Sequence, residues 1–180
     1  MKILGIDPGT WRLGVGLIES QGNSYKLLHS EVITNKEKTA IANRLKKIYF
    51  SLKEIIQKYH PDVMALENVF YSEDPQALLR LGEARGCVML AASEAGIDVI
   101  EYPPARVKQS VSGNGRATKG QVQQMVKTLL NLKISPAADA ADALAVAICH
   151  LHNANRFDLR TQLSAAKRTK NPNTLRVVKY

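Results

Sequence analysis

Four acidic residues occupy positions where hydrophobic elements would ordinarily carry apolar side chains. Asp7 ends the apolar run at residues 2–6, Glu67 follows the run at 63–66, and Asp139 and Asp142 lie in an alanine-rich segment. Burying a carboxylate is unfavourable unless a cation neutralises it. No lysine or arginine lies within one helical turn of these acids along the sequence. A hard divalent metal held by oxygen ligands is the natural alternative partner, so the chain is a candidate metal-dependent enzyme.

The spacing of Asp139 and Asp142 places both carboxylates on one face of a helix. We expect this helix to start at Pro136, after Ser135, and to end near His152. Asp139 is then fourth and Asp142 seventh in the helix, so neither is a helix cap. The alternative is a pair of solvated acids near a helix start. The neighbouring alanines favour burial, because small side chains let a helix lie close against a sheet.

Asp7 and Glu67 are each ambiguous when considered alone. Asp7 begins an Asp-Pro-Gly sequence that is also common in turns, and Glu67 could be a surface acid. The joint occurrence of acids after two strands and on one helix favours a single site. Four carboxylates around two magnesium ions about 4 Å apart can cleave a phosphodiester: one ion activates water and the other stabilises the leaving oxygen.

The charge of the chain favours a polyanionic partner. The 180 residues carry a formal charge of +9, and residues 153–180 hold seven Lys/Arg against one acid, Asp158. Nucleic acid is the commonest such partner, although composition alone equally fits a merely basic soluble protein. No apolar run reaches membrane-spanning length and the N-terminus does not resemble a signal peptide. We therefore expect a cytoplasmic protein that does not bind membranes.

The hydrophobic pattern predicts an α/β fold with a mixed five-stranded sheet flanked by helices on both faces. Short connections between the first three strands indicate an antiparallel meander, and later helical crossovers indicate parallel strands. Ligands of such sheets gather at the carboxyl ends of parallel strands. We expect one domain over residues 1–152 and a basic, disordered tail over 153–180. The predicted strands are 2–7, 13–19, 25–34, 62–67 and 97–102; the predicted helices start near 41, 74, 118 and 136, with a linker over 103–115.

Several motifs together resemble the RuvC family of Holliday-junction resolvases, which is ribonuclease-H-like. The similarity extends from residue 3 to about 152, and the set of motifs is far more specific than any one of them. The resemblance implies that Asp7, Glu67, Asp139 and Asp142 are catalytic metal ligands for two Mg²⁺ ions, with Mn²⁺ able to substitute. The motifs are Gly5-Ile6-Asp7-Pro8-Gly9-Thr10, Leu66-Glu67-Asn68-Val69-Phe70, Leu81-Gly82-Glu83-Ala84-Arg85-Gly86, Val107-Lys108-Gln109 and Ala138-Asp139-Ala140-Ala141-Asp142-Ala143-Leu144.

The resemblance also implies a homodimer that nicks two strands of like polarity across a four-way DNA junction during recombination and repair. It further implies contact with a RuvA–RuvB branch-migration complex. Two symmetric cuts need two sites related by a two-fold axis. The helix that carries Gly82 and Gly86 is a candidate interface, and packing of this helix on its own sheet is the alternative.

Basic and aromatic residues are candidates for contact with DNA. Lys108 and Lys119 match lysines that are catalytically important in the family, although solvated surface lysines would look the same in sequence. Phe70 and Tyr71 could stack on an unpaired base or could pack against the following helix. Arg106 and Arg116 are expected to hold backbone phosphates.

Three other functions compete with a junction resolvase. A sugar-kinase or actin-like ATPase shares the Asp-x-Gly-Thr motif, but it needs two such domains and therefore a longer chain. A ribonuclease-H-like RNA-processing nuclease would use the same acids. A non-catalytic junction-binding module is disfavoured, because binding alone gives no reason to concentrate negative charge at a DNA surface.

Overall fold

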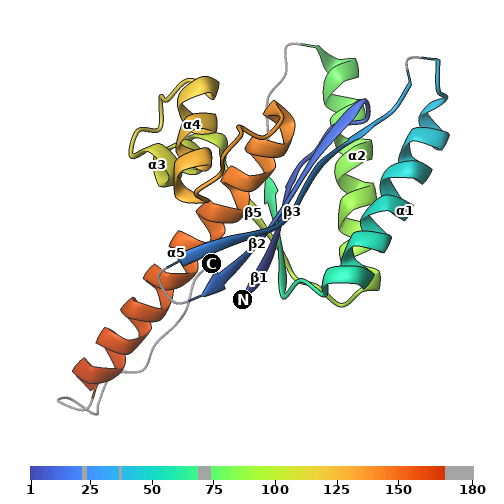
Figure 1. Ribbon diagram of the computed structural model, residues 1–180. Coiled ribbons are helices and arrows are strands. Elements are labelled where there is room, and N and C mark those ends of the chain that lie inside the picture. The colour runs from blue at the N-terminus through green and yellow to red at the C-terminus, as the bar shows by residue number, and fades with distance from the viewer. Residues whose placement is uncertain (22–23, 37, 69–73, 169–180) are drawn as a thin grey trace.

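The computed structural model describes the backbone of residues 1–21, 24–36, 38–68 and 74–168, with the side chains of all of these except residues 21 and 155–168. A single mixed sheet forms the middle layer, with helices on both faces (Figure 1). None of the described helices is long and apolar enough to cross a membrane.

The sheet has the strand order β3-β2-β1-β4-β5. The antiparallel meander predicted for the first three strands is confirmed, and the last two strands run parallel to β1. The carboxyl ends of β1, β4 and β5 therefore meet at one edge of the sheet. The strands are β1 (Lys2–Asp7), β2 (Arg12–Gln21), β3 (Ser24–Thr34), β4 (Val63–Glu67) and β5 (Val99–Tyr102).

A hydrophobic core lies on each face of the sheet, between the strands and the helices that cover that face. On one face, α1 (Ile41–Tyr59) and α2 (Pro75–Glu94) bury residues such as Ile48 and Val88 against β1, β2 and β4. On the other face, α3 (Pro104–Ser112), α4 (Lys119–Leu129) and α5 (Ala138–Arg168) share a second core. The predicted arrangement of helices on both faces is thus confirmed.

The region between β5 and α4 differs from the prediction. Residues 103–115 were expected to be a linker, but residues 104–112 form α3. Pro104 occupies the first turn of this helix, where proline is tolerated because the first N–H groups have no helical partner. Val107 and Val111 lie one turn apart, and both are buried. A nine-residue helix is too short for its apolar pattern to stand out beside two prolines.

The last helix also differs from the prediction at both ends. It begins at Ala138 rather than Pro136, and its first hydrogen bond runs from the Ala141 N–H to the Ala137 carbonyl. Asp139 therefore lies in the first helical turn, where a carboxylate also interacts favourably with the helix dipole. The helix continues to Arg168 instead of ending near His152. Residues 169–180 lie outside the described part of the chain.

Glycines on β1 and β2 let α5 lie directly on the sheet. A Cβ atom on Gly5 would be 2.0 Å from the carbonyl oxygen of Ala143, and one on Gly14 would be 2.0 Å from that of Asp139. No side chain fits in such a space, so the backbone of α5 touches the backbone of the strands. This contact determines where Asp139 and Asp142 lie relative to Asp7.

We expect Gly5→Ala to destabilise the protein by at least about 2 kcal/mol, because overpacking a rigid contact with backbone atoms forces the helix away from the sheet. Gly120→Ala is the matched control, since a Cβ atom at Gly120 meets nothing within 4 Å. The control should be neutral or should stabilise α4 by up to about 1 kcal/mol. Urea unfolding of the two variants measures both effects, and equal midpoints would contradict the proposed role of this contact.

Candidate active site

Three of the four predicted acids converge at the carboxyl edge of the parallel strands. Ile6 of β1 pairs with Leu66 of β4, so Asp7 and Glu67, the last residues of these two strands, lie side by side. Asp142 reaches the same place from α5. These three side chains line one small pocket of about 90 Å³, together with Lys108, Lys119, Val107, Val122 and Ala145. The expectation that distant acids meet is therefore confirmed for Asp7, Glu67 and Asp142.

Burial and neighbouring acids disfavour the charged forms of Asp7 and Glu67. Burial, followed by the charges of Glu67 and Asp142, raises the pKa of Asp7 to about 7, while Lys119 acts in the opposite direction. Asp139 also raises the pKa of Asp7, which places its charge within range of the pocket. Burial and the charge of Asp142 raise the pKa of Glu67. The pocket therefore favours any additional positive charge.

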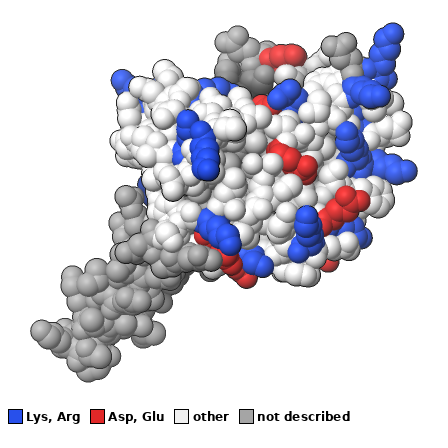
Figure 2. Space-filling view, in the orientation of Figure 1, with Lys and Arg blue, Asp and Glu red and all other residues white. Residues whose placement is uncertain are grey.

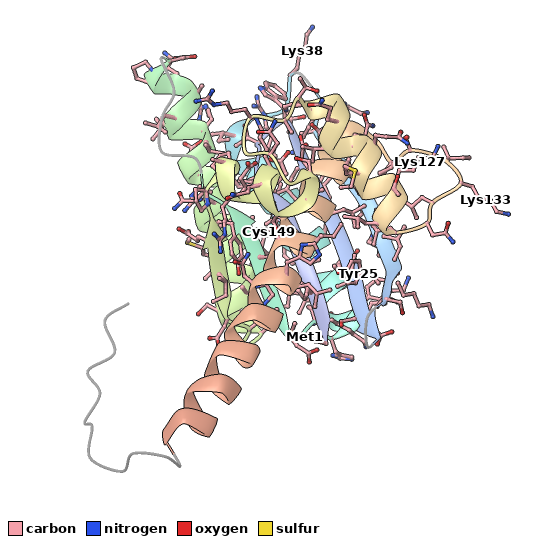
Figure 3. The ribbon with its side chains drawn as sticks, turned by 90° about the vertical axis from the view of Figure 1, so that its left-hand side faces the viewer. Met1, Tyr25, Lys38, Lys127, Lys133 and Cys149 are labelled. Carbon is pink, nitrogen blue, oxygen red and sulfur yellow. The ribbon has the colours of Figure 1, made fainter. Side chains whose placement is uncertain are left out.

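Two lysines supply part of that charge. The Lys119 ammonium lies 3.3 Å from a carboxylate oxygen of Asp142, and this charge raises the pKa of Lys119. Lys119 is the first residue of α4, whose start is held in place by a capping box between Thr118 and Gln121. Lys108 lines the pocket from α3, and its charge lowers the pKa of Glu67. Figure 3 views the molecule from the side where α3 and α4 pack against α5.

Asp139 does not line the pocket and is paired with an arginine that the sequence did not indicate. The Arg12 Nε atom lies 2.5 Å from a carboxylate oxygen of Asp139. The absence of cations near the acids along the sequence is therefore misleading, because Arg12 and Lys119 approach from other elements. The pattern predicts the second strand over 13–19 and leaves Arg12 in the turn, whereas in the structure Arg12 is the first residue of β2.

The chemistry of the donors fits a magnesium ion, because all four candidate ligands are carboxylates. Burial and the charges of neighbouring acids raise the pKa values of Asp7 and Glu67, and a divalent cation would offset both effects. Among the described residues, however, no three His, Cys, Asp or Glu side chains already form a metal-binding group. Asp139 and Asp142 each hold a cationic side chain instead. A metal held by all four carboxylates would compete with these two cationic side chains for Asp139 and Asp142.

Of the remaining predicted DNA contacts, Arg106 and Arg116 do not line this pocket. Phe70 and Tyr71 lie outside the described residues. Arg106 is exposed on α3 and donates a hydrogen bond to the Asn153 side chain on α5. Arg116 is exposed in the turn before α4, where its backbone N–H donates to Asn114. Neither Arg106 nor Arg116 lines the pocket with the carboxylates.

A mixed five-stranded sheet between two helical layers, with acids at the carboxyl edge of its parallel strands, is a ribonuclease-H-like architecture. The crystal structure of the yeast mitochondrial Holliday junction resolvase shares this fold, with a TM-score of 0.61 at 15% identity over 83% of this chain and 77% of that one.

More specific similarity comes from one family. The family model described as crossover junction endodeoxyribonuclease RuvC matches residues 3–150. A RuvC of Geotalea uraniireducens is 50% identical over 156 residues, which cover 85% of this chain and 90% of the relative. The Thermus thermophilus RuvC structure with a Holliday junction substrate has a TM-score of 0.81 at 35% identity, covering 86% of this chain and 94% of that one. The chain belongs to the RuvC family of crossover junction endodeoxyribonucleases.

We expect Asp7→Asn to stabilise the metal-free protein at alkaline pH. The folded-state pKa of about 7 is above the value of about 3.9 for an unfolded aspartate, so ionising Asp7 opposes folding. The penalty is absent below about pH 4, grows as the pH rises through this window, and is complete above about pH 7. Each pKa unit is worth about 1.4 kcal/mol, so the gain should be at most a few kcal/mol.

Thermal unfolding in EDTA at pH 4.5 and pH 8 measures this effect. The Tm difference between Asp7→Asn and wild type should be larger at pH 8. Asp98→Asn is the control, because Asp98 is an exposed acid in the segment before β5. A variant less stable than wild type at pH 8 would show that Asp7 is not an unfavourably buried charge.

Proposed function

We propose that this chain resolves four-way DNA junctions by two symmetric, magnesium-dependent nicks. The observation that carries the proposal is the convergence of Asp7, Glu67 and Asp142 with two lysines at one sheet edge, in a chain of the RuvC family. Clustered acids alone would repel DNA, so a cluster flanked by cations favours a site that binds metal and a phosphate together.

Asp7, Glu67, Asp139 and Asp142 would hold two magnesium ions, and manganese would substitute. When bound, the metal would lower the pKa of the attacking water and stabilise the leaving oxygen. Asp7 must lose its proton to become a ligand, and its pKa of about 7 makes this unfavourable at acidic pH. Metal affinity should therefore fall as the pH drops below about 7.

The two lysines have separate roles in this proposal. The Lys119 side chain is 83% exposed, so it can leave Asp142 and contact a phosphate when DNA enters. Lys108 is half-buried and lines the pocket, where it would stabilise negative charge on the reacting phosphate. Arg106 and Arg116 would contact phosphates further away, and Phe70 and Tyr71 would stack on unpaired bases. Contact with a RuvA–RuvB complex remains an expectation from the family.

The outer face of α2 supports a homodimer. Positions Gly82 and Gly86 have nothing within 4 Å of an added Cβ atom, so these glycines do not pack on the chain's own sheet. Leu90 on α2 and Phe50 on α1 are more than half exposed, and both line an open groove of about 470 Å³ between the two helices. A second copy of the chain would bury this apolar surface and supply the second cut.

We expect Asp7→Asn to bind a four-way junction with the affinity of wild type but not to cut it, because removing one carboxylate weakens the metal site without removing a phosphate contact. Cleavage of a four-way junction, a linear duplex and an RNA–DNA hybrid in magnesium, alongside a gel-shift assay, tests this. Equal cutting of duplex or hybrid by wild type would contradict junction specificity, and cutting of the hybrid alone would favour RNA processing.

We expect Leu90→Glu to convert the dimer into monomers, because it places a charge in the apolar groove. Ile134→Glu is the matched control, since Ile134 is an exposed apolar residue outside this face. Light scattering should give half the mass for Leu90→Glu and an unchanged mass for the control. The monomer should leave nicked junctions rather than resolved duplexes. A wild type that is already monomeric at micromolar concentration would refute the proposed interface.

A further inference from the structure

The turn between β1 and β2 carries a large aromatic side chain at the surface. Trp11 is the single tryptophan of the chain, and it is 42% exposed. The guanidinium carbon of Arg44, on α1, lies 3.2 Å from the centre of its ring. A ring that is covered by a cation on one side and partly exposed can still stack on a base or a sugar.

The turn is held in place by the end of β3. The buried Asn35 side chain donates a hydrogen bond to the Thr10 carbonyl, and the Asn35 N–H donates to the Trp11 carbonyl. An open hollow of about 530 Å³ is lined by Trp11, Arg12, Thr34 and Asn35. This volume is in the range of sites that take small organic groups, so the hollow is large enough for part of a nucleotide. The two hydrogen bonds from Asn35 hold its wall in place.

The surface beside the hollow is strongly cationic. Residues 32–52 contain five Lys/Arg and a single acid, Glu37. Arg44 donates to the Thr39 carbonyl in the segment before α1, and Lys47 donates to the Thr34 carbonyl at the end of β3. Among the described residues, no ion pair neutralises Arg44 or Lys47. Figure 2 shows Lys and Arg side chains gathered over the region where α1 lies in Figure 1.

This cationic surface and the lysines of the pocket lie on opposite sides of the acids. The strand order is β3-β2-β1-β4-β5, and Trp11 and Arg12 lie where β2 starts beside the end of β3. Lys108 belongs to α3, which follows β5 at the other side of the sheet. Asp7 and Glu67 end the two strands between them. The Arg12–Asp139 contact joins the cationic surface directly to the acidic cluster.

We propose that Trp11, Arg12, Arg44 and Lys47 form a second DNA-binding surface, which holds the junction strand on the β3 side of the scissile phosphate. Trp11 stacks on a base or sugar in the hollow, and Arg44 and Lys47 contact backbone phosphates. Arg12 exchanges its contact with Asp139 for a phosphate, which releases that carboxylate for the metal. This inference rests on the proposed function, because it takes four-way junction DNA as the ligand.

Intrinsic fluorescence tests the surface directly, because Trp11 is the only tryptophan that can report. The probe is an intact four-way junction added to full-length Asp7→Asn in magnesium, so that the DNA is not cut. Anisotropy of a labelled junction measures binding in the same samples. We expect Trp11 emission to be quenched at least twofold along the anisotropy curve, with reduced access to acrylamide.

The variant Arg44→Gln/Lys47→Gln, in the same Asp7→Asn background, tests the phosphate contacts. It should weaken junction binding roughly tenfold and lower the slope of log affinity against log salt by about two. Lys58→Gln is the matched control, because Lys58 is exposed in the last turn of the same helix. The control should change neither the affinity nor the slope.

The outcomes separate this inference from the proposed function. Junction binding with unchanged Trp11 emission, or with equal salt slopes for the double variant and the control, overturns the second surface and leaves resolvase function intact. Absence of junction binding in the anisotropy measurement refutes the proposed function, and the second surface with it. Quenching together with the loss of slope supports the surface.

Discussion

The backbone contact between α5 and the first two strands is the constraint on which the candidate site depends. Gly5 and Gly14 have no side chain, and the facing residues of α5 include Ala143 and the backbone of Asp139. This contact sets one end of α5 beside the end of β1. A bulkier residue at either glycine would move both acids of the helix away from Asp7. The small residues of the core therefore serve the position of the acids as well as packing.

The site balances negative charge with cations from separate elements. Lys119 comes from α4, Lys108 from α3 and Arg12 from β2, and each interacts with a different carboxyl of the cluster. None of these cations is close to its partner along the chain, so the balance depends on the assembled fold. The pKa of Asp7 still remains at about 7, so the charged form of this carboxyl is unfavourable when no metal is bound. In the proposed function, metal and phosphate would replace these cationic side chains beside the carboxylates.

In the proposed function, the sheet edge binds and cuts DNA, and the outer face of α2 associates with a second copy of the chain. The edge presents the acids between two cationic surfaces, whereas the apolar groove between α1 and α2 lies on the layer across the sheet from α5. A dimer through that groove would leave both acidic pockets accessible. In the proposed function, binding of DNA and association of two copies would therefore use different surfaces of the same small fold.

The sequence by itself determined the sheet, the two helical layers and the convergence of Asp7, Glu67 and Asp142, because hydrophobic periodicity and strand-end acids are local signals. It predicted neither α3, whose nine residues are too few for a clear pattern, nor the bounds of α5, where a proline and a polar composition were poor markers. Only the tertiary structure decided the pairing of Arg12 with Asp139, which are 127 residues apart, and of Lys119 with Asp142. Such pairs depend on how helices pack on the sheet, and no spacing along the chain encodes that geometry.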